Sequence, residues 1–235
     1  MLAEIARALL VIFLAAAVPI LSRKTARPEL LRQVPRTTLY LSAVFSQWIL
    51  AVAALAVVFV SKGGLAAVGF RPIHWVLFGR WGVGLAGTAV AGLGLVIFLE
   101  NRGWLPPEPE TVHLLMPETL KEKLWALFLV APTAAVCEEF LYRGFLLTAL
   151  TAWFHSARWG VAVSSLGFGL AHTYQGASGV ARAALLGALL AVPVVRYGSI
   201  YPAVLAHFLI DATALLWLGP RFLRRPSQAG KPLAP

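Results

Sequence analysis

The chain is poor in charge. Only 13% of its 235 residues are Asp, Glu, Lys or Arg, whereas 59% are hydrophobic. A soluble domain carries about a quarter charged residues, so this composition excludes an ordinary soluble fold. There is one cysteine, Cys137, which excludes an internal disulfide and a multi-cysteine metal site. There is also one aspartate, Asp211, and it lies in an apolar stretch.

Long apolar runs make up most of the chain. Residues 39–60 (LYLSAVFSQWILAVAALAVVFV) are long enough to span a hydrocarbon core of about 30 Å. We therefore predict an all-α fold, a polytopic bundle of transmembrane helices around an intramembrane cavity. Seven spans are expected, over residues 2–21, 38–60, 81–99, 122–152, 159–176, 179–195 and 200–218. The fourth is too long for one straight crossing, so an eighth, re-entrant or split helix is the alternative.

Connections and small residues complete this picture of the bundle. Residues 61–80 are predicted to be a connection that ends in the amphipathic stretch IHWVLFGR. Residues 100–121 are the most polar and proline-rich part of the chain, and we predict a surface loop there that acts as a lid at the mouth of a site. Gly84 and Thr88 have the spacing of small residues that let helices pack closely.

The basic residues indicate a membrane surface. The net charge is +10, and Lys and Arg gather in residues 22–36 and 221–235, which flank apolar spans. This is the bias of cytoplasmic loops, and such clusters also attract anionic lipid. Binding to nucleic acid is not expected from this placement. The composition, rich in Ala, Gly and Arg, indicates a bacterium, so we expect a multi-pass protein of the bacterial inner (cytoplasmic) membrane.

Ionisable side chains inside the spans are the functional candidates. Each costs on the order of 2.5–3.5 kcal/mol at a helix centre on insertion scales, so a chain retains few without a use. They are Glu138, Glu139, Arg143, His172, His207 and Asp211. They come from the fourth, fifth and seventh spans at similar depth, counted at 1.5 Å per residue. We therefore expect one shared cavity.

Helical spacing separates the two neighbouring glutamates. Glu139 and Arg143 are four residues apart and can form an ion pair, whereas Glu138 points about 100° away and stays free. His207 and Asp211 also share a helix face, as do Phe168 and His172. A free carboxylate beside imidazoles can take a proton from water, and neighbouring groups can stabilise an oxyanion. A water-activating hydrolase within the membrane is the resulting hypothesis.

Other interpretations of the same residues remain open. EExxxR by itself fits a structural ion pair, and Cys137 fits a packing residue better than a nucleophile. Two histidines and a carboxylate, here His172, His207 and Glu138, are a known zinc set, although we expect no cofactor. Intramembrane Glu, His and Asp also suit a proton-coupled transporter, or a scaffold without enzymatic activity.

Three motifs resemble those of a known family. EEFLYR (138–143), FGLAH (168–172) and HFLID (207–211) are similar in order and spacing to the EExxxR, FxxxH and HxxxN/D motifs of the CPBP family. This is the CAAX protease and bacteriocin-processing group, also called ABI, of intramembrane proteases, and it includes the type II CAAX prenyl endopeptidases. The resemblance covers about residues 125–215.

The resemblance implies roles for these residues. Glu138 would be the catalytic glutamate and His172 its partner in activating water. His207 and Asp211 would stabilise the oxyanion, with Glu139 and Arg143 as the structural pair and Phe168 in support. CAAX proteases have Asn where this chain has Asp211, and an ionised Asp cannot donate to an oxyanion. Asp211 is therefore protonated, orients His207, or has another role.

The resemblance also implies an organisation and a kind of substrate. Residues 1–121 would be N-terminal transmembrane helices and loops that match the family poorly, and residues 122–218 the catalytic core. Residues 219–235 would be a basic, flexible cytoplasmic tail. The expected substrate is a membrane-tethered protein or peptide. A bacterial peptide is favoured over a prenylated one, because prenylation is unexpected in a bacterium.

Overall fold

The computed structural model describes residues 2–62 and 64–218, and every regular element in them is a helix apart from one isolated β-bridge between Phe70 and Ser199. The predicted all-α fold is confirmed. The predicted flexible tail, residues 219–235, lies outside the described residues.

The N-terminal half holds three long helical runs. α1 (Leu2–Ile12), a π-helical turn (Phe13–Ala17) and α2 (Val18–Thr25) form the first, which the short α3 (Pro28–Leu31) follows. α4 (Arg36–Val60) forms the second, and a 3-10 turn (Leu65–Val68) links it to α5 (Trp75–Asn101), the third. Short α6 (Glu110–Leu115) interrupts the connection to the fourth run.

The C-terminal half begins with that fourth run. It comprises α7 (Leu120–Trp125), a π-helical turn (Ala126–Val130), α8 (Ala131–Glu138), a second π-helical turn (Glu139–Leu146) and α9 (Leu147–Phe154). α10 (Ala157–Ala171), a 3-10 turn (Thr173–Gln175) and α11 (Gly176–Tyr197) follow. The last elements are α12 (Tyr201–Thr213) and a π-helical turn (Ala214–Leu218).

Each of the seven predicted spans contains a helix. Five helical runs are long and apolar enough to cross a membrane, namely Leu2–Thr25, Arg36–Val60, Trp75–Asn101, Leu120–Phe154 and Thr173–Tyr197. The fifth and seventh predicted spans are shorter helices, α10 and the apolar run Tyr201–Leu216. Apolar side chains such as Ile49, Phe128 and Val195 are exposed on the outside of the bundle, where lipid would cover them.

Two boundary predictions are wrong. The third span begins at Trp75 and not near residue 81, because His74 caps the helix by accepting the Val76 N–H through Nδ1 at 3.3 Å. Most of IHWVLFGR is therefore helix. The fifth helix ends at Ala171 and not at residue 176, because a 3-10 turn and Gly176, at φ +72°, redirect the chain.

The fourth run is continuous and central. It is one helical run of 35 residues, so it is not split. In its most apolar 18 residues, 50% of the residues are buried, whereas the corresponding share in the other candidate spans is 17–39%. Pro132 stands at the start of α8, directly after a π-helical turn. A proline donates no backbone hydrogen bond, and the wider turn accommodates that loss.

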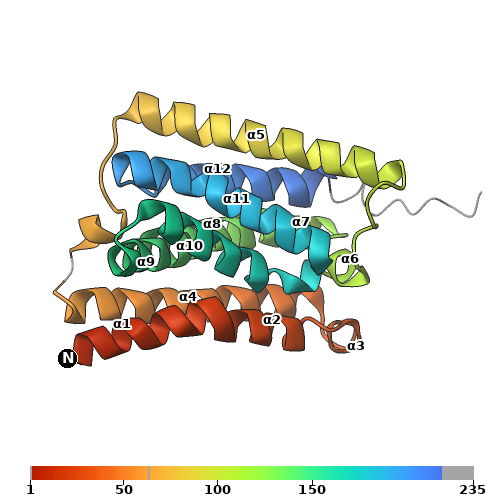
Figure 1. The fold of residues 1–235 in the computed structure, drawn as a ribbon. Coiled ribbons are helices and arrows are strands. Elements are labelled where there is room, and N and C mark those ends of the chain that lie inside the picture. Colours follow the sequence, from red (N-terminus) through yellow and green to blue (C-terminus); the bar gives the residue numbers. More distant parts are fainter. Residues whose placement is uncertain (1, 63, 219–235) are drawn as a thin grey trace, which may run out of the picture.

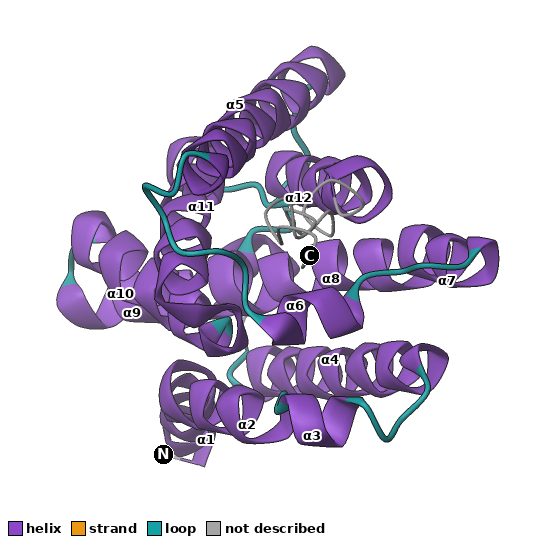
Figure 2. Ribbon diagram, turned by 90° about the vertical axis from the view of Figure 1, so that its right-hand side faces the viewer, coloured by secondary structure: helices purple, strands orange, loops and turns teal. Residues whose placement is uncertain are grey.

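The helices form layers around this run. Figure 1 shows α1, α2 and α4 on one side, α8 to α10 in the middle, α11 and α12 next, and α5 outermost on the opposite side. Figure 2, turned by 90°, again places α4 and α5 on opposite sides of the central helices. α3 and α6 lie together at one end of the bundle (Figure 1). The central run thus meets neighbours on both sides.

Close helix packing depends on glycines other than the predicted one. A Cβ at Gly84 would meet nothing within 4 Å, so its predicted packing role is wrong. A Cβ at Gly82 would lie 2.5 Å from the side chain of Leu205 on α12. On α10, a Cβ at Gly169 would lie 2.7 Å from the carbonyl oxygen of Val180 on α11. Only glycine permits that backbone approach, which fixes the end of α10 that carries His172.

Candidate active site

Three helical elements bring the candidate residues together. Glu138 is the last residue of α8, and Glu139 and Arg143 lie in the π-helical turn that follows. Phe168 lies near the end of α10 with His172 directly after it, and α12 supplies His207 and Asp211. π-helical turns are rare and often occur at functional sites.

Glu139 is the centre of a buried polar cluster. Its side chain has no exposure, and its Oε1 accepts a hydrogen bond from His207 Nδ1 at 2.7 Å. Arg143 Nη1 lies 3.1 Å from the same oxygen, as the four-residue spacing predicts. The contact with His207 was not predicted, because it joins helices 68 residues apart in the chain. Glu139 therefore orients the His207 ring.

In the part of the chain that the structure describes, no arginine pairs with Glu138, as its different helix face predicts. Its Oε1 accepts a hydrogen bond from Gln47 Nε2 at 2.7 Å, and its Oε2 lies 3.9 Å from His207 Nε2. Gln47 belongs to α4 and was not predicted, because its side chain is uncharged and cannot titrate. The available signal was a polar amide in the middle of an apolar run.

His172 has a defined tautomer. Its Nδ1 lies 2.8 Å from the backbone carbonyl oxygen of Phe168. A carbonyl oxygen only accepts, so Nδ1 carries the hydrogen in this contact. In the neutral ring Nε2 then has a lone pair available for a water molecule.

The ring of Phe168 packs between the polar side chains of the site. The Arg143 guanidinium lies over its ring, with Cζ 4.0 Å from the centroid. The ring centroids of His172 and His207 lie 4.7 Å and 6.2 Å from that of Phe168. Phe168 is buried, so packing against its ring adds to the Arg143 ion pair and to the hydrogen bonds of the two histidines.

Asp211 and Cys137 differ in their relation to the cluster. Asp211 Oδ2 lies 3.6 Å from His207 Nε2, and its side chain is 30% exposed. This is ionic proximity rather than a hydrogen bond. Cys137 is fully buried in the apolar core, which fits its interpretation as a packing residue.

Two cavities flank the site. One, which we call the α4 cavity, has about 320 Å³ and is lined by Gln47, Glu138 and His172 together with residues of α2 and α4. The other, the α5 cavity, has about 420 Å³ and is lined by His172, His207 and Asp211 together with residues of α5 and α11. Glu138 and His207 thus lie on different cavities, and His172 lies on both.

The predicted lid lies against both cavities. Val112, His113 and Met116 line the α5 cavity, and Leu115 lines the α4 cavity. α6 carries three of these four residues, and Met116 directly follows it.

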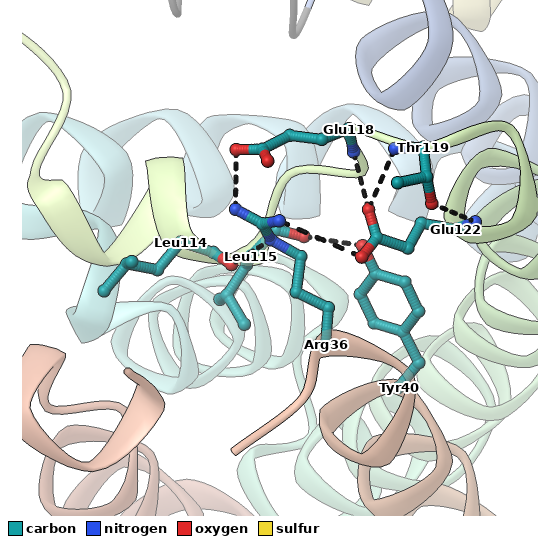
Figure 3. Close-up of polar contacts among 7 residues, drawn as sticks. All are labelled: Arg36, Tyr40, Leu114, Leu115, Glu118, Thr119 and Glu122. Carbon is teal, nitrogen blue, oxygen red and sulfur yellow. Dashed lines mark hydrogen bonds and ion pairs between the residues drawn. The ribbon is translucent and has the colours of Figure 1, made fainter. Parts of the chain in front are cut away.

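Polar contacts fasten the lid to α4. Arg36 donates to the Leu114 carbonyl oxygen at 2.9 Å and to Glu118 at 2.7 Å, and it faces Glu122 at 3.8 Å (Figure 3). Tyr40 donates to the Leu115 carbonyl oxygen at 2.9 Å.

Two further arginines hold the same connection. Arg32 pairs with Glu110, and this contact raises the pKa of the Arg32 guanidinium above its ordinary value. Arg182 of α11 pairs with Glu108 and, at 3.3 Å, with Glu100. The connection is therefore anchored to helices on both sides of the bundle.

The donor groups are not arranged for a metal ion. Within residues 2–62 and 64–218, no three His, Cys, Asp or Glu side chains are grouped so that they could hold one. Each histidine uses Nδ1 in a contact with Phe168 or Glu139, which leaves only Nε2 of each ring as a possible ligand atom. The zinc set Glu138, His172 and His207 is therefore not grouped as a metal site in the described residues.

Comparison with known families identifies this part of the chain. A family model described as type II CAAX prenyl endopeptidase Rce1-like matches residues 120–213, from the start of α7 to the end of α12. We call these residues the Rce1-like segment, because they are similar to that family. All three motifs lie within it, so the resemblance noted in the sequence is confirmed. No curated protein and no solved structure matches the chain.

The similarity of this segment to the family indicates a general class of activity. Together with the apolar helices, it supports a multi-pass membrane protein with CAAX-type intramembrane protease activity in general. The first three helical runs lie outside the matched residues. Gln47, which touches Glu138, is in that unmatched part.

Proposed function

We propose that the chain is an intramembrane endopeptidase that hydrolyses a peptide bond in a membrane-associated protein or peptide, using water activated by Glu138. The observation that carries this proposal is the separation of the two glutamates. Arg143 pairs with Glu139, whereas the Glu138 carboxylate lies on a cavity wall with His172, and its Oε2 faces His207 Nε2.

The first step is attack by water. Glu138 takes a proton from a water molecule that His172 orients through Nε2, and the hydroxide adds to the substrate carbonyl carbon. The carbonyl π electrons move to oxygen, giving a tetrahedral oxyanion. The protonated Glu138 then passes its proton to the leaving amine as the C–N bond breaks.

His207 and Asp211 serve the oxyanion in this scheme. His207 Nδ1 donates to Glu139, so Nε2 can donate to the oxyanion only when the ring is doubly protonated. The Asp211 carboxyl near Nε2 supports that imidazolium form. Asp211 would thus act through His207 rather than replace the Asn of CAAX proteases as a donor.

The two cavities suit different reactants. The apolar residues Leu93, Leu186 and Leu189 line the α5 cavity, which suits a peptide segment. Ser22 and Thr25 on the wall of the α4 cavity suit water. His172, on both walls, would stand between water and peptide.

Basic residues near α3 suit a membrane surface that carries negative charge. Arg23, Lys24 and Arg27 are exposed near the α3 end, which suits contact with anionic lipid at the cytoplasmic face of a bacterial inner membrane. The substrate would be a bacterial membrane-tethered peptide or protein, and nucleic acid would have no part.

The test compares peptide termini in cell membranes that carry the intact chain, Glu138→Ala or His172→Ala. Loss of a general base lowers a rate by about 10²- to 10⁴-fold, so products of the intact chain should disappear in the first variant. Glu4→Ala, a change at an exposed carboxylate that lines neither cavity, is the control. Undiminished product from the Glu138 variant, at equal amounts of inserted protein, would reject the proposal.

Two alternatives have their own outcomes in the same material. A zinc enzyme would lose activity in chelator and regain it with added zinc. A proton-coupled transporter or a scaffold would yield no Glu138-dependent peptide. The transporter would also show flux that follows a pH gradient.

A further inference from the structure

Gln47 is an amide in the middle of an apolar helix. α4 crosses the bundle from Arg36 to Val60, and Gln47 lies between the hydrophobic segments of that run. Burying an amide in an apolar region is unfavourable unless it forms hydrogen bonds. Gln47 forms one with Glu138, at 2.7 Å between Nε2 and Oε1.

The chemistry of this contact fixes the direction of the amide. An ionised carboxylate only accepts hydrogen bonds, so the NH2 group of Gln47 faces Glu138. With Oε1 held in this way, Glu138 cannot rotate freely, and its Oε2 stays 3.9 Å from His207 Nε2. Gln47 also lines the α4 cavity beside Glu138.

We propose that Gln47 is a positioning residue for the catalytic base: it holds Glu138 in the rotamer that faces the water of the α4 cavity. This inference rests on the proposed protease function. It assigns part of the active site to α4, outside the Rce1-like segment of residues 120–213.

Other contacts hold α4 in register with the site. Trp48 Nε1 lies 3.4 Å from Thr133 Oγ1 on α8, one residue along from Gln47. Tyr40 and Arg36 fix the start of α4 to the lid. The helix is thus held at its start and beside the site, so the Gln47 amide meets Glu138 at a defined position.

The test uses Gln47→Met, which keeps the length of the side chain and removes the donor. The probe is a membrane-tethered reporter that carries the sequence cleaved by the intact chain. Misplacing a catalytic group by about 1 Å can cost about 10²-fold, so we expect kcat to fall by about 10- to 100-fold. KM should stay within about twofold, because ground-state binding of the peptide is unchanged.

Ser46→Ala is the matched control. Ser46 lines the same cavity from the same helix, but its hydroxyl donates to the Ala43 carbonyl oxygen, 2.9 Å away in its own helix. This variant should keep both kcat and KM. Equal losses in the two variants would show that any change of this wall matters, which would overturn a specific role for Gln47.

Gln47→Glu adds a readout that a purely structural role would not move. The introduced carboxyl can donate to Glu138 only while it is protonated, and once ionised it repels Glu138. The ratio of its rate to that of the intact chain should therefore fall as pH rises. A ratio that is constant with pH would contradict the proposal.

The outcomes separate this inference from the function itself. If Glu138→Ala retains full cleavage, the protease mechanism fails, and the role of Gln47 with it. If Glu138→Ala abolishes cleavage while Gln47→Met cleaves like the intact chain, only the positioning role is overturned. Thermal unfolding of each purified variant in detergent shows whether a loss reflects the site or the fold.

Discussion

At the scale of single residues, Glu139 is the centre of the buried ionic contacts. It has no exposure and shares one oxygen between His207 and Arg143. A buried ion left without its partner is strongly destabilising, whereas an exposed pair contributes little. Glu139 thus supports the fold and, through the His207 ring, the site.

A matched pair of substitutions tests this at the residue scale. Glu139→Gln leaves Arg143 buried without a counter-ion, and the free energy of unfolding should fall by about 3–5 kcal/mol. Glu118→Gln removes a carboxylate, 58% exposed, that pairs with Arg36, and should change it by about 1 kcal/mol or less. Denaturant titration in detergent measures both. Similar losses in the two variants would contradict the buried role of Glu139.

At the scale of elements, the site depends on how α10 meets α11. The Phe168 carbonyl that orients His172 lies next to Gly169, where a Cβ would collide with the backbone of Val180. Any side chain at Gly169 pushes against backbone, and backbone yields less readily than a flexible side chain. Moving the end of α10 moves His172.

Gly169→Ala is the corresponding prediction. The added Cβ would lie 2.7 Å from the Val180 carbonyl oxygen, so stability should fall by about 1–3 kcal/mol and cleavage should fall with it. Gly84→Ala, where the Cβ meets nothing within 4 Å, should shift stability by about 1 kcal/mol at most. The melting temperature and the rate of reporter cleavage are measured for both variants. A tolerated Gly169→Ala would show that α10 can shift without loss.

At the scale of the whole molecule, one connection forms ion pairs with helices on two sides of the bundle. The 100–121 connection is anchored by arginines of the α2–α4 side and of α11, and its residues line both cavities. Opening this segment would change access to the α4 and α5 cavities at once. The connection suits a single gate for water and peptide.

Arg36→Ala should loosen that gate. Arg36 contacts Leu114, Glu118 and Glu122, so its removal should speed amide hydrogen exchange in residues 110–118 by roughly tenfold, with global stability nearly unchanged. Arg7→Ala, which removes a surface pair with Glu4, is the control. Mass spectrometry of the protein in lipid nanodiscs resolves these peptides. Unchanged exchange would mean that the other anchors suffice.

Much of the candidate site could be predicted because it depends on spacing along single helices. The four-residue interval places Arg143 beside Glu139, and the neighbouring position turns Glu138 to another face. The contacts of Gln47 with Glu138 and of Glu139 with His207 could not be predicted. They join residues 91 and 68 positions apart, and no local pattern encodes which helices become neighbours.

By itself, the sequence determined the class of the protein: apolar length requires membrane helices, and three spaced motifs indicate the Rce1-like segment. Those properties depend on composition and local periodicity. Only the tertiary structure decided that α4 reaches Glu138, that Glu139 orients His207, and that the 100–121 connection lines two cavities. Helix packing sets these relations, because the shapes of facing side chains and glycine contacts select the neighbours of each helix.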